Sequence, residues 1–118
     1  MKTINNIVIN SSNSFPKNYE NLPSGPFYDL FLSNNSVLID VRSFGEYVVG
    51  KIPGAINIDV SRSDFKIQVE ELPKEKIYLV YCRSGNRSKT ACEIMINLGF
   101  ENVKNLEKGL ISWRFGIV

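Results

Sequence analysis

The segment that decides the fold runs from residue 77 to residue 98 and reads IYLVYCRSGNRSKTACEIMINL. Its first residues, Ile77–Tyr81, form an unbroken apolar and aromatic run, which predicts a buried strand. The polar residues that follow lead into a helix that begins near Ser88. In that helix the apolar side chains repeat at i, i+3, i+4 and i+7, at Ala91, Ile94, Met95 and Leu98. A buried strand, a short loop and an amphipathic helix are the repeating unit of an α/β domain.

The same unit occurs upstream. Val37–Ile39 is a short apolar run that ends in Asp40, as a buried parallel strand would. Ser43–Val49 is predicted to be a short helix, because Ser43 and Glu46 have the spacing of a capping box. A glycine ends this helix, and a turn leads into a second strand at Ala55–Ile58.

The rest of the chain continues the alternation. Ser24 is predicted to cap a helix that carries Phe27, Leu30 and Phe31. A short helix is expected in the middle segment before Pro73, then a strand at Val103–Leu106 and a closing helix at Leu110–Phe115. Strands that alternate with helices predict one α/β domain with a mostly parallel central sheet. We place this domain at residues 22–118. Residues 1–21 are an Asn- and Ser-rich N-terminal extension, in which Ile4 and Ile7–Ile9 allow one edge strand.

Composition excludes several classes of site and partner. The chain has 118 residues, 14 Lys plus Arg, 12 Asp plus Glu, two Cys and no His. It therefore has no Ser-His-Asp or Cys-His unit and no His-ligated zinc. The small, scattered positive charge gives no reason to expect nucleic acid or a membrane as partner. Two cysteines without a disulfide framework, and no signal peptide or long apolar segment, predict a cytoplasmic protein.

The polar loop after Ile77–Tyr81 has the features of an activated thiol. Cys82 follows a buried strand and precedes a helix N-terminus, whose free N–H groups attract negative charge. Gly85 allows successive amides to converge on one point. Cysteines in such positions, or beside arginine, have pKa values of roughly 3.5–7.5 instead of about 8.5. Arg83 and Arg87 are expected to hold an oxyanion at the same pocket, and the Ser84 and Ser88 hydroxyls to donate to the sulfur.

The alternative for a lone cysteine at the end of a core strand is a small buried apolar residue. Two arginines and a glycine within five residues of Cys82 favour the nucleophile. Cys92, one turn into the following helix, is predicted to be a core thiol, with the role of a resolving cysteine as the weaker alternative. Asp40 and Arg42 end a neighbouring strand, where they are expected to brace the rim of the site and not to take part in catalysis.

These residues also resemble a known family. Residues 82–88, CRSGNRS, are similar to the active-site loop of single-domain rhodanese-like sulfurtransferases. Asp40-Val41-Arg42, Glu46-Tyr47 and GKIPGAINI at residues 50–58 resemble the family's first motif, and LEKGLISW at 106–113 resembles its C-terminal one. Lys51 stands where the family commonly has His, and Lys108 where it commonly has the first glycine of a pair.

The resemblance implies a central, mostly parallel five-stranded sheet flanked by helices on both faces. It also implies that Cys82 is the catalytic nucleophile and carries a persulfide, with a substrate- and anion-binding loop formed by Arg83, Ser84, Gly85, Asn86, Arg87 and Ser88. The implied reaction moves sulfur from a donor such as thiosulfate to cyanide, a thiol or a thioredoxin-like protein. It requires no metal or organic cofactor, and the expected assembly is a monomer or weak homodimer.

Two other functions stay open at this stage. The first is a rhodanese-like sulfur carrier or regulatory binding module with little turnover. The second is a cysteine-dependent phosphatase or arsenate reductase, in which the loop between Cys and Arg is longer because it wraps a tetrahedral oxyanion. Here only four residues separate Cys82 from Arg87. This shorter loop favours a single sulfur atom as its ligand.

Overall fold

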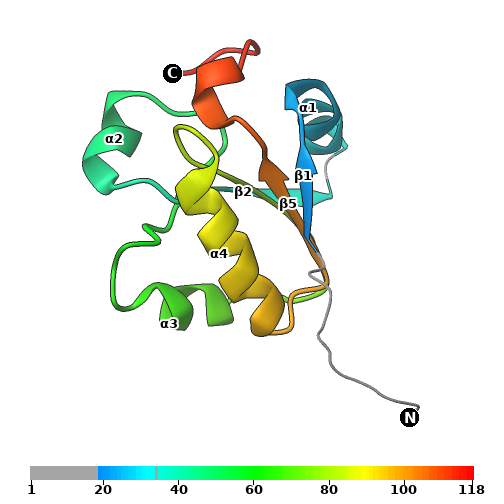
Figure 1. Ribbon diagram of the computed structural model, residues 1–118, viewed down its shortest axis with the longest axis vertical. Coiled ribbons are helices and arrows are strands. Elements are labelled where there is room, and N and C mark those ends of the chain that lie inside the picture. The colour runs from blue at the N-terminus through cyan, green and yellow to red at the C-terminus, as the bar shows by residue number, and fades with distance from the viewer. Residues whose placement is uncertain (1–18, 34) are drawn as a thin grey trace.

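The computed structural model describes residues 19–33 and 35–118, and within them strands and helices alternate along the chain (Figure 1). In chain order the elements are β1 (Tyr19–Leu22), α1 (Ser24–Leu32), β2 (Ser36–Asp40), α2 (Phe44–Val49), β3 (Ile56–Asn57), α3 (Phe65–Glu70), β4 (Ile77–Tyr81), α4 (Asn86–Asn97), β5 (Asn102–Leu106) and the 3-10 helix η1 (Gly109–Ser112). Among the described residues, no helix is long and apolar enough to cross a membrane.

The strands form one parallel, five-stranded sheet in the order β1-β5-β4-β2-β3. This confirms the predicted α/β architecture, and the strand predicted at Ile77–Tyr81 is β4, at the centre of the sheet. Asp40 is the register partner of Tyr81, and the N–H of Val41 donates to the carbonyl of Tyr81 at 3.0 Å. The turn after β2 therefore lies directly beside the loop that starts at Cys82.

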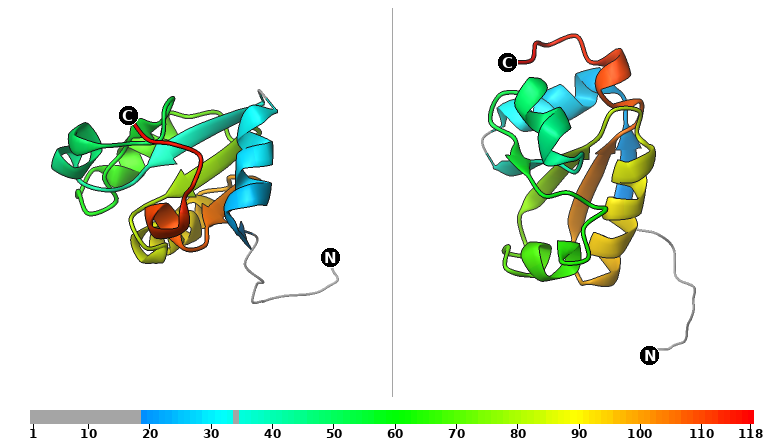
Figure 2. Two further views of the ribbon diagram at one scale, coloured as in Figure 1. Left: turned by 90° about the horizontal axis from the view of Figure 1, so that it is seen from above. Right: turned by 90° about the vertical axis from the view of Figure 1, so that its left-hand side faces the viewer.

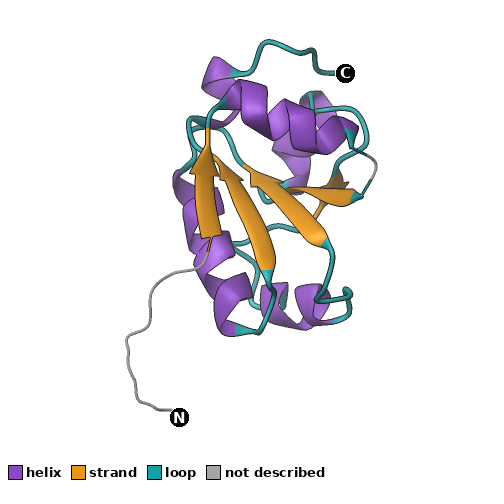
Figure 3. Cartoon of the chain, turned by 90° about the vertical axis from the view of Figure 1, so that its right-hand side faces the viewer, coloured by secondary structure: helices purple, strands orange, loops and turns teal. Residues whose placement is uncertain are grey.

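Helices cover both faces of the sheet, as expected (Figure 2, Figure 3). Because side chains alternate along a strand, β4 supplies both layers of the core. Tyr78 and Val80 belong to a buried cluster that includes residues of α3 and α4. Leu79 and Tyr81 belong to a second buried cluster, which includes Phe27 of α1 and packs against the partly buried Leu110 of η1. Cys82 continues the alternation into the first cluster, so its side chain lies on the α4 side of the sheet.

The capping box predicted at the start of α2 is present. Ser43 Oγ accepts a hydrogen bond from the N–H of Glu46 at 3.2 Å, and Glu46 Oε1 accepts one from the N–H of Ser43 at 3.1 Å. These bonds satisfy backbone donors that a short helix would otherwise leave free. They also hold the Glu46 side chain at the start of α2, from where its carboxylate reaches the residues that follow β4.

Two local predictions are wrong. Instead of a closing helix at Leu110–Phe115, the chain forms one 3-10 turn, and Trp113 is already extended. The following segment pairs with the loop after α2, where the backbone of Val118 exchanges hydrogen bonds of 2.8 and 2.9 Å with Lys51. Ser24 is not a helix cap: α1 begins on it, and its hydroxyl donates to the carbonyl of Ser112 at 3.1 Å.

The two edge strands of the sheet, β1 and β3, have other bounds than the sequence predicted. β1 pairs in parallel with β5 from Tyr19 onward, so the sheet includes residues that we assigned to the N-terminal extension. The strand expected at Ala55–Ile58 is shorter, with only Ile56–Asn57 paired to β2. The edge strand considered at Ile4 and Ile7–Ile9 lies outside the described residues.

Candidate active site

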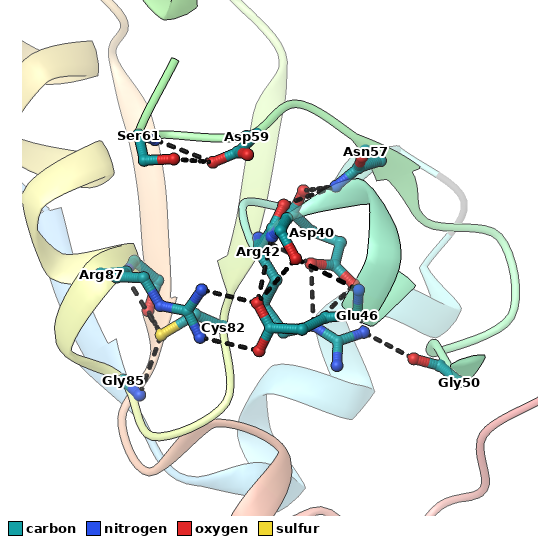
Figure 4. Close-up of polar contacts among 12 residues, drawn as sticks. Asp40, Arg42, Glu46, Gly50, Asn57, Asp59, Ser61, Cys82, Gly85 and Arg87 are labelled. Carbon is teal, nitrogen blue, oxygen red and sulfur yellow. Dashed lines mark hydrogen bonds and ion pairs between the residues drawn. The ribbon is translucent and has the colours of Figure 1, made fainter. Parts of the chain in front are cut away.

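The loop between β4 and α4 surrounds the sulfur of Cys82 with donors. The backbone N–H groups of Gly85 and Ser88 donate to Sγ at 3.2 and 3.3 Å, and the Ser88 hydroxyl lies 3.3 Å from it (Figure 4). Burial alone would raise the pKa of this thiol. The Ser88 hydroxyl, together with the N–H groups of Ser88, Gly85 and Ser84, outweighs burial and lowers the pKa below its ordinary value. The loop is therefore built to hold a thiolate without histidine.

Two glycines allow the loop to pack against the segment after β5. Gly85 has a positive φ of 97°, and a Cβ there would lie 2.1 Å from the carbonyl oxygen of Glu107. Gly109 has a φ of 58°, and a Cβ there would lie 2.4 Å from the carbonyl oxygen of Arg83. Any side chain at either position would separate the two segments.

Backbone hydrogen bonds join the same two segments. The N–H of Leu110 donates to the carbonyl of Cys82, and the N–H of Ile111 to the carbonyl of Arg83, both at 3.1 Å. The C-terminal segment thus forms a support on which the loop rests. This supporting role was not predicted from the sequence, where the segment only resembles the family's C-terminal motif.

Asn105 is a further residue that the sequence analysis did not single out. It is almost fully buried on β5, and its Nδ2 donates to Asn21 Oδ1 at 2.8 Å and to the carbonyl of Gly85 at 3.4 Å. Its Oδ1 has no hydrogen-bond partner among the described residues. The only sequence signal was a polar residue within a strand, which does not by itself point to a site.

Asp40 and Arg42 form a buried ion pair beside the loop. Arg42 Nη2 donates to Asp40 Oδ2 at 2.7 Å, and Arg42 Nε donates to both carboxylate oxygens at 3.0 and 3.1 Å. Arg42 Nη2 also donates to the carbonyl of Gly50 at 2.6 Å, and Asn57 Nδ2 donates to the carbonyls of both Asp40 and Arg42. Arg42 thereby connects the end of β2 to the end of α2, and Asn57 connects it to β3. The charges of Asp40 and Arg42 neutralise each other.

Arg87 is also engaged, with a partner 41 positions away. Its Nη1 and Nη2 donate to Oε1 and Oε2 of Glu46 at 2.8 and 3.1 Å. The hydrogen bond from Arg87 is the main reason that the pKa of Glu46 falls to about 2, so the carboxylate is ionised at neutral pH. The predicted oxyanion-binding role of Arg87 therefore competes with an ion pair to Glu46, which was predicted to belong to the capping box and to the motif that resembles the family's first one.

The remaining loop residues and the second cysteine have simpler surroundings. Arg83 is exposed and forms no ion pair within the described part of the chain. Ser84 and Asn86 are exposed as well. Cys92 is fully buried on α4, and burial raises the pKa of its thiol. Of the two cysteines, Cys82 is the one whose surroundings favour the reactive thiolate form.

An open groove of about 340 Å³ lies between α2, the loop after β4 and η1. It is lined by Arg42, Glu46, Val49, Gly50, Arg83, Leu110, Ile111 and Ile117. The apolar side chains among these come mostly from the C-terminal region, and Ile117 packs over Gly50. A ligand in this groove would contact an apolar wall and Arg83, the loop arginine that forms no ion pair with another described residue.

Known proteins that resemble this chain point to one family. The family described as "Rhodanese-like domain" matches residues 25–115. A protein of Allochromatium vinosum named "Sulfurtransferase" is 36% identical over 77 residues, which cover 65% of this chain and 70% of that protein. YtwF of Bacillus subtilis, which carries a sulfurtransferase name, is 41% identical over 76 residues, covering 64% of this chain and 71% of that protein.

The chain is also similar to solved structures and to parts of larger proteins. A rhodanese-related protein from Thermoplasma volcanium has a TM-score of 0.73 at 30% identity, covering 85% of this chain and 98% of that one. The tRNA uridine(34) hydroxylase of Cytophaga hutchinsonii is 36% identical over 80 residues, covering 65% of this chain. Only 26% of that hydroxylase is covered, so the likeness concerns one part of a longer protein.

Proposed function

The chain belongs to the rhodanese-like domain family, and from this premise we propose that it is a sulfurtransferase in which Cys82 carries the transferred sulfur as a persulfide. The observation that carries the proposal is the set of loop donors around Sγ, two backbone N–H groups and the Ser88 hydroxyl. They favour the thiolate, which is the nucleophilic form of cysteine.

The proposed reaction has two steps. The Cys82 thiolate attacks the outer sulfur of a donor such as thiosulfate. The sulfur–sulfur bond of the donor breaks, sulfite leaves with the electron pair, and a persulfide remains on Cys82. An acceptor nucleophile then attacks the terminal sulfur, and Cys82 leaves as the thiolate from which it started. The covalent intermediate divides one transfer into two displacements, for which ping-pong kinetics are expected.

The other site residues receive supporting roles in this proposal. The loop amides stabilise the negative charge of the persulfide, as an oxyanion hole stabilises oxygen. Arg83 attracts anionic donors, because it is exposed and unpaired among the described residues. The Asp40–Arg42 pair keeps the rim in place through its bond to Gly50. The cycle uses no metal and no organic cofactor.

The acceptor is proposed to be a small thiol or a thioredoxin-like protein, and cyanide serves as acceptor in the assay. Both cysteines of the chain are free, and a cycle that passes through a free thiolate suits a reducing compartment such as the cytoplasm. A monomer or weak homodimer is sufficient, because every residue used above comes from one chain.

The experiment is the intact mass of the protein after incubation with thiosulfate, and again after addition of cyanide. The expected result is the gain of one sulfur atom, reversed by cyanide with release of thiocyanate. Mass resolution must separate one sulfur from two oxygens, since these nearly coincide. Cys82→Ser should abolish the adduct and Cys92→Ser should leave it, because the loop donors lower the pKa of the Cys82 thiol whereas burial raises that of Cys92. An adduct that persists in Cys82→Ser would refute the assignment, and an adduct that forms without turnover would indicate a sulfur carrier.

A further inference from the structure

The ion pair between Glu46 and Arg87 stands at the active-site loop. Glu46 comes from α2 and Arg87 from the first turn of α4, and all four terminal oxygen and nitrogen atoms are used in the two hydrogen bonds. Figure 4 shows the Arg87 guanidinium with Cys82 on one side and Glu46 on the other. Arg87 also interacts electrostatically with Cys82. Loss of the Glu46 charge that balances Arg87 would therefore change the electrostatic potential at the sulfur.

The charges around the groove are unequally balanced. Arg42 is matched by Asp40 and Arg87 by Glu46, which leaves Arg83 as the unpaired cation of the loop among the described residues. Glu46 itself lines the groove, and its side chain is about one-third exposed. An incoming anion therefore meets a carboxylate at the wall of the groove, and it competes with that carboxylate for Arg87.

We propose that Glu46 sets the charge preference of the site: its carboxylate opposes the attraction of Arg83 for anions at the groove and favours neutral or cationic thiols as sulfur acceptors. The preference among acceptors rests on the proposed sulfurtransferase function. The electrostatic effect of Glu46 on Cys82 does not depend on that function, and it can be measured from the reactivity of the thiol alone.

Glu46→Gln separates this role from the helix-capping role of the same side chain. The amide oxygen of glutamine still accepts from the N–H of Ser43, so the capping box is retained. The substitution removes one negative charge and weakens the bond to Arg87. Glu101→Gln is the matched control. It removes the same charge from an exposed position just before β5, at the amino ends of the strands, whereas the site lies at their carboxyl ends.

The first test compares iodoacetate with iodoacetamide, two alkylating reagents of similar size that differ by one charge. Peptide mass spectrometry gives the rate at Cys82 for each reagent, and the ratio of the two rates cancels changes in thiol pKa and access. Glu46→Gln should raise the iodoacetate-to-iodoacetamide ratio about fivefold at low ionic strength, and less in high salt. Glu101→Gln should leave the ratio at its original value.

Three outcomes would overturn the proposal. They are an unchanged ratio in Glu46→Gln, an equal rise in Glu101→Gln, or a Cys82 that reacts with neither reagent in any variant. The last would mean that burial, and not charge, controls access to the sulfur.

The second test uses sulfur transfer from the Cys82 persulfide to thiols of similar size. In each reaction the acceptor thiolate attacks the terminal sulfur, the bond between that sulfur and Sγ breaks, and the acceptor leaves as a persulfide. Glu46→Gln should raise kcat/KM for 3-mercaptopropionate relative to 2-mercaptoethanol and lower it for cysteamine. If no persulfide forms at all, the proposed function fails while the alkylation ratio still tests Glu46. If transfer proceeds with unchanged acceptor preferences, only the role of Glu46 fails.

Discussion

Replacement of Ser88 by alanine tests how the loop holds the Cys82 thiolate, because it removes one donor and leaves the others. Ser88 Oγ lies 3.3 Å from Sγ, and the N–H groups of Gly85 and Ser88 donate at 3.2 and 3.3 Å. An ionised sulfur carries no proton, so in the thiolate the hydroxyl must be the donor. Both N–H donors remain in Ser88→Ala, and the helix gains a residue of higher helix propensity.

The expected size of the effect follows from this single hydrogen bond. A hydrogen bond to a charged group contributes about 1.5–3 kcal/mol, and a contact of 3.3 Å to sulfur belongs at the lower end. One pKa unit corresponds to about 1.4 kcal/mol, so the loss should raise the pKa of Cys82 by about one unit. The rise is in this direction because the hydroxyl stabilises the charged form, and its removal moves the pKa back towards the ordinary value.

The assay is the rate of Cys82 alkylation by iodoacetamide as a function of pH, read at the peptide level so that Cys92 does not contribute. Below both pKa values the variant should react about tenfold more slowly, and above both the rates should converge. Ser84→Ala is the control, since Ser84 acts on the thiol through its backbone N–H. An unchanged pKa in Ser88→Ala, or an equal shift in Ser84→Ala, would refute this account of the thiolate.

Two further predictions concern the supports of the loop, and thermal or chemical denaturation measures both. Asp40→Ala should destabilise the fold by about 3 kcal/mol or more, because it leaves the buried Arg42 charge unpaired, whereas Asp64→Ala in an exposed pair should barely move the denaturation midpoint. Gly109→Ala should cost more than about 2 kcal/mol, because the added methyl meets the backbone of the loop. Gly116 also has a positive φ, 98° against 58° at Gly109, but it has open space around an added methyl, so Gly116→Ala should cost about 1 kcal/mol. Equal losses at the two glycines would show that backbone strain, and not the contact with the loop, is responsible.

The elements that could be predicted from the sequence are those whose signal is local. The apolar run Ile77–Tyr81 is β4 without change of bounds, because a buried parallel strand needs apolar residues on both faces. The capping box of Ser43 and Glu46 depends on residues three positions apart and is present as expected. The candidate nucleophile Cys82 was likewise found from its immediate neighbours.

The contacts that could not be predicted are those between distant parts of the chain. The partner of Arg87 is Glu46, 41 positions away, and neither residue alone shows that the two side chains meet. The hydrogen bond from Asn105 to Gly85 is of the same kind. A closing helix was predicted at Leu110–Phe115, but the backbone pairing of Val118 with Lys51 draws the last residues into an extended path. In each case tertiary contacts override or complete a local signal.

The packing of the loop also explains one departure of this chain from the family pattern it resembles. The family commonly has two glycines where this chain has Lys108-Gly109. Only the second position is constrained here: a Cβ at Gly109 would lie 2.4–2.6 Å from carbonyl atoms of Arg83 and Cys82, whereas the Lys108 side chain is exposed. Gly85 makes the reciprocal approach to Glu107. The active-site loop and the C-terminal motif are therefore two halves of one close backbone contact, which requires a glycine from each half and tolerates lysine beside it.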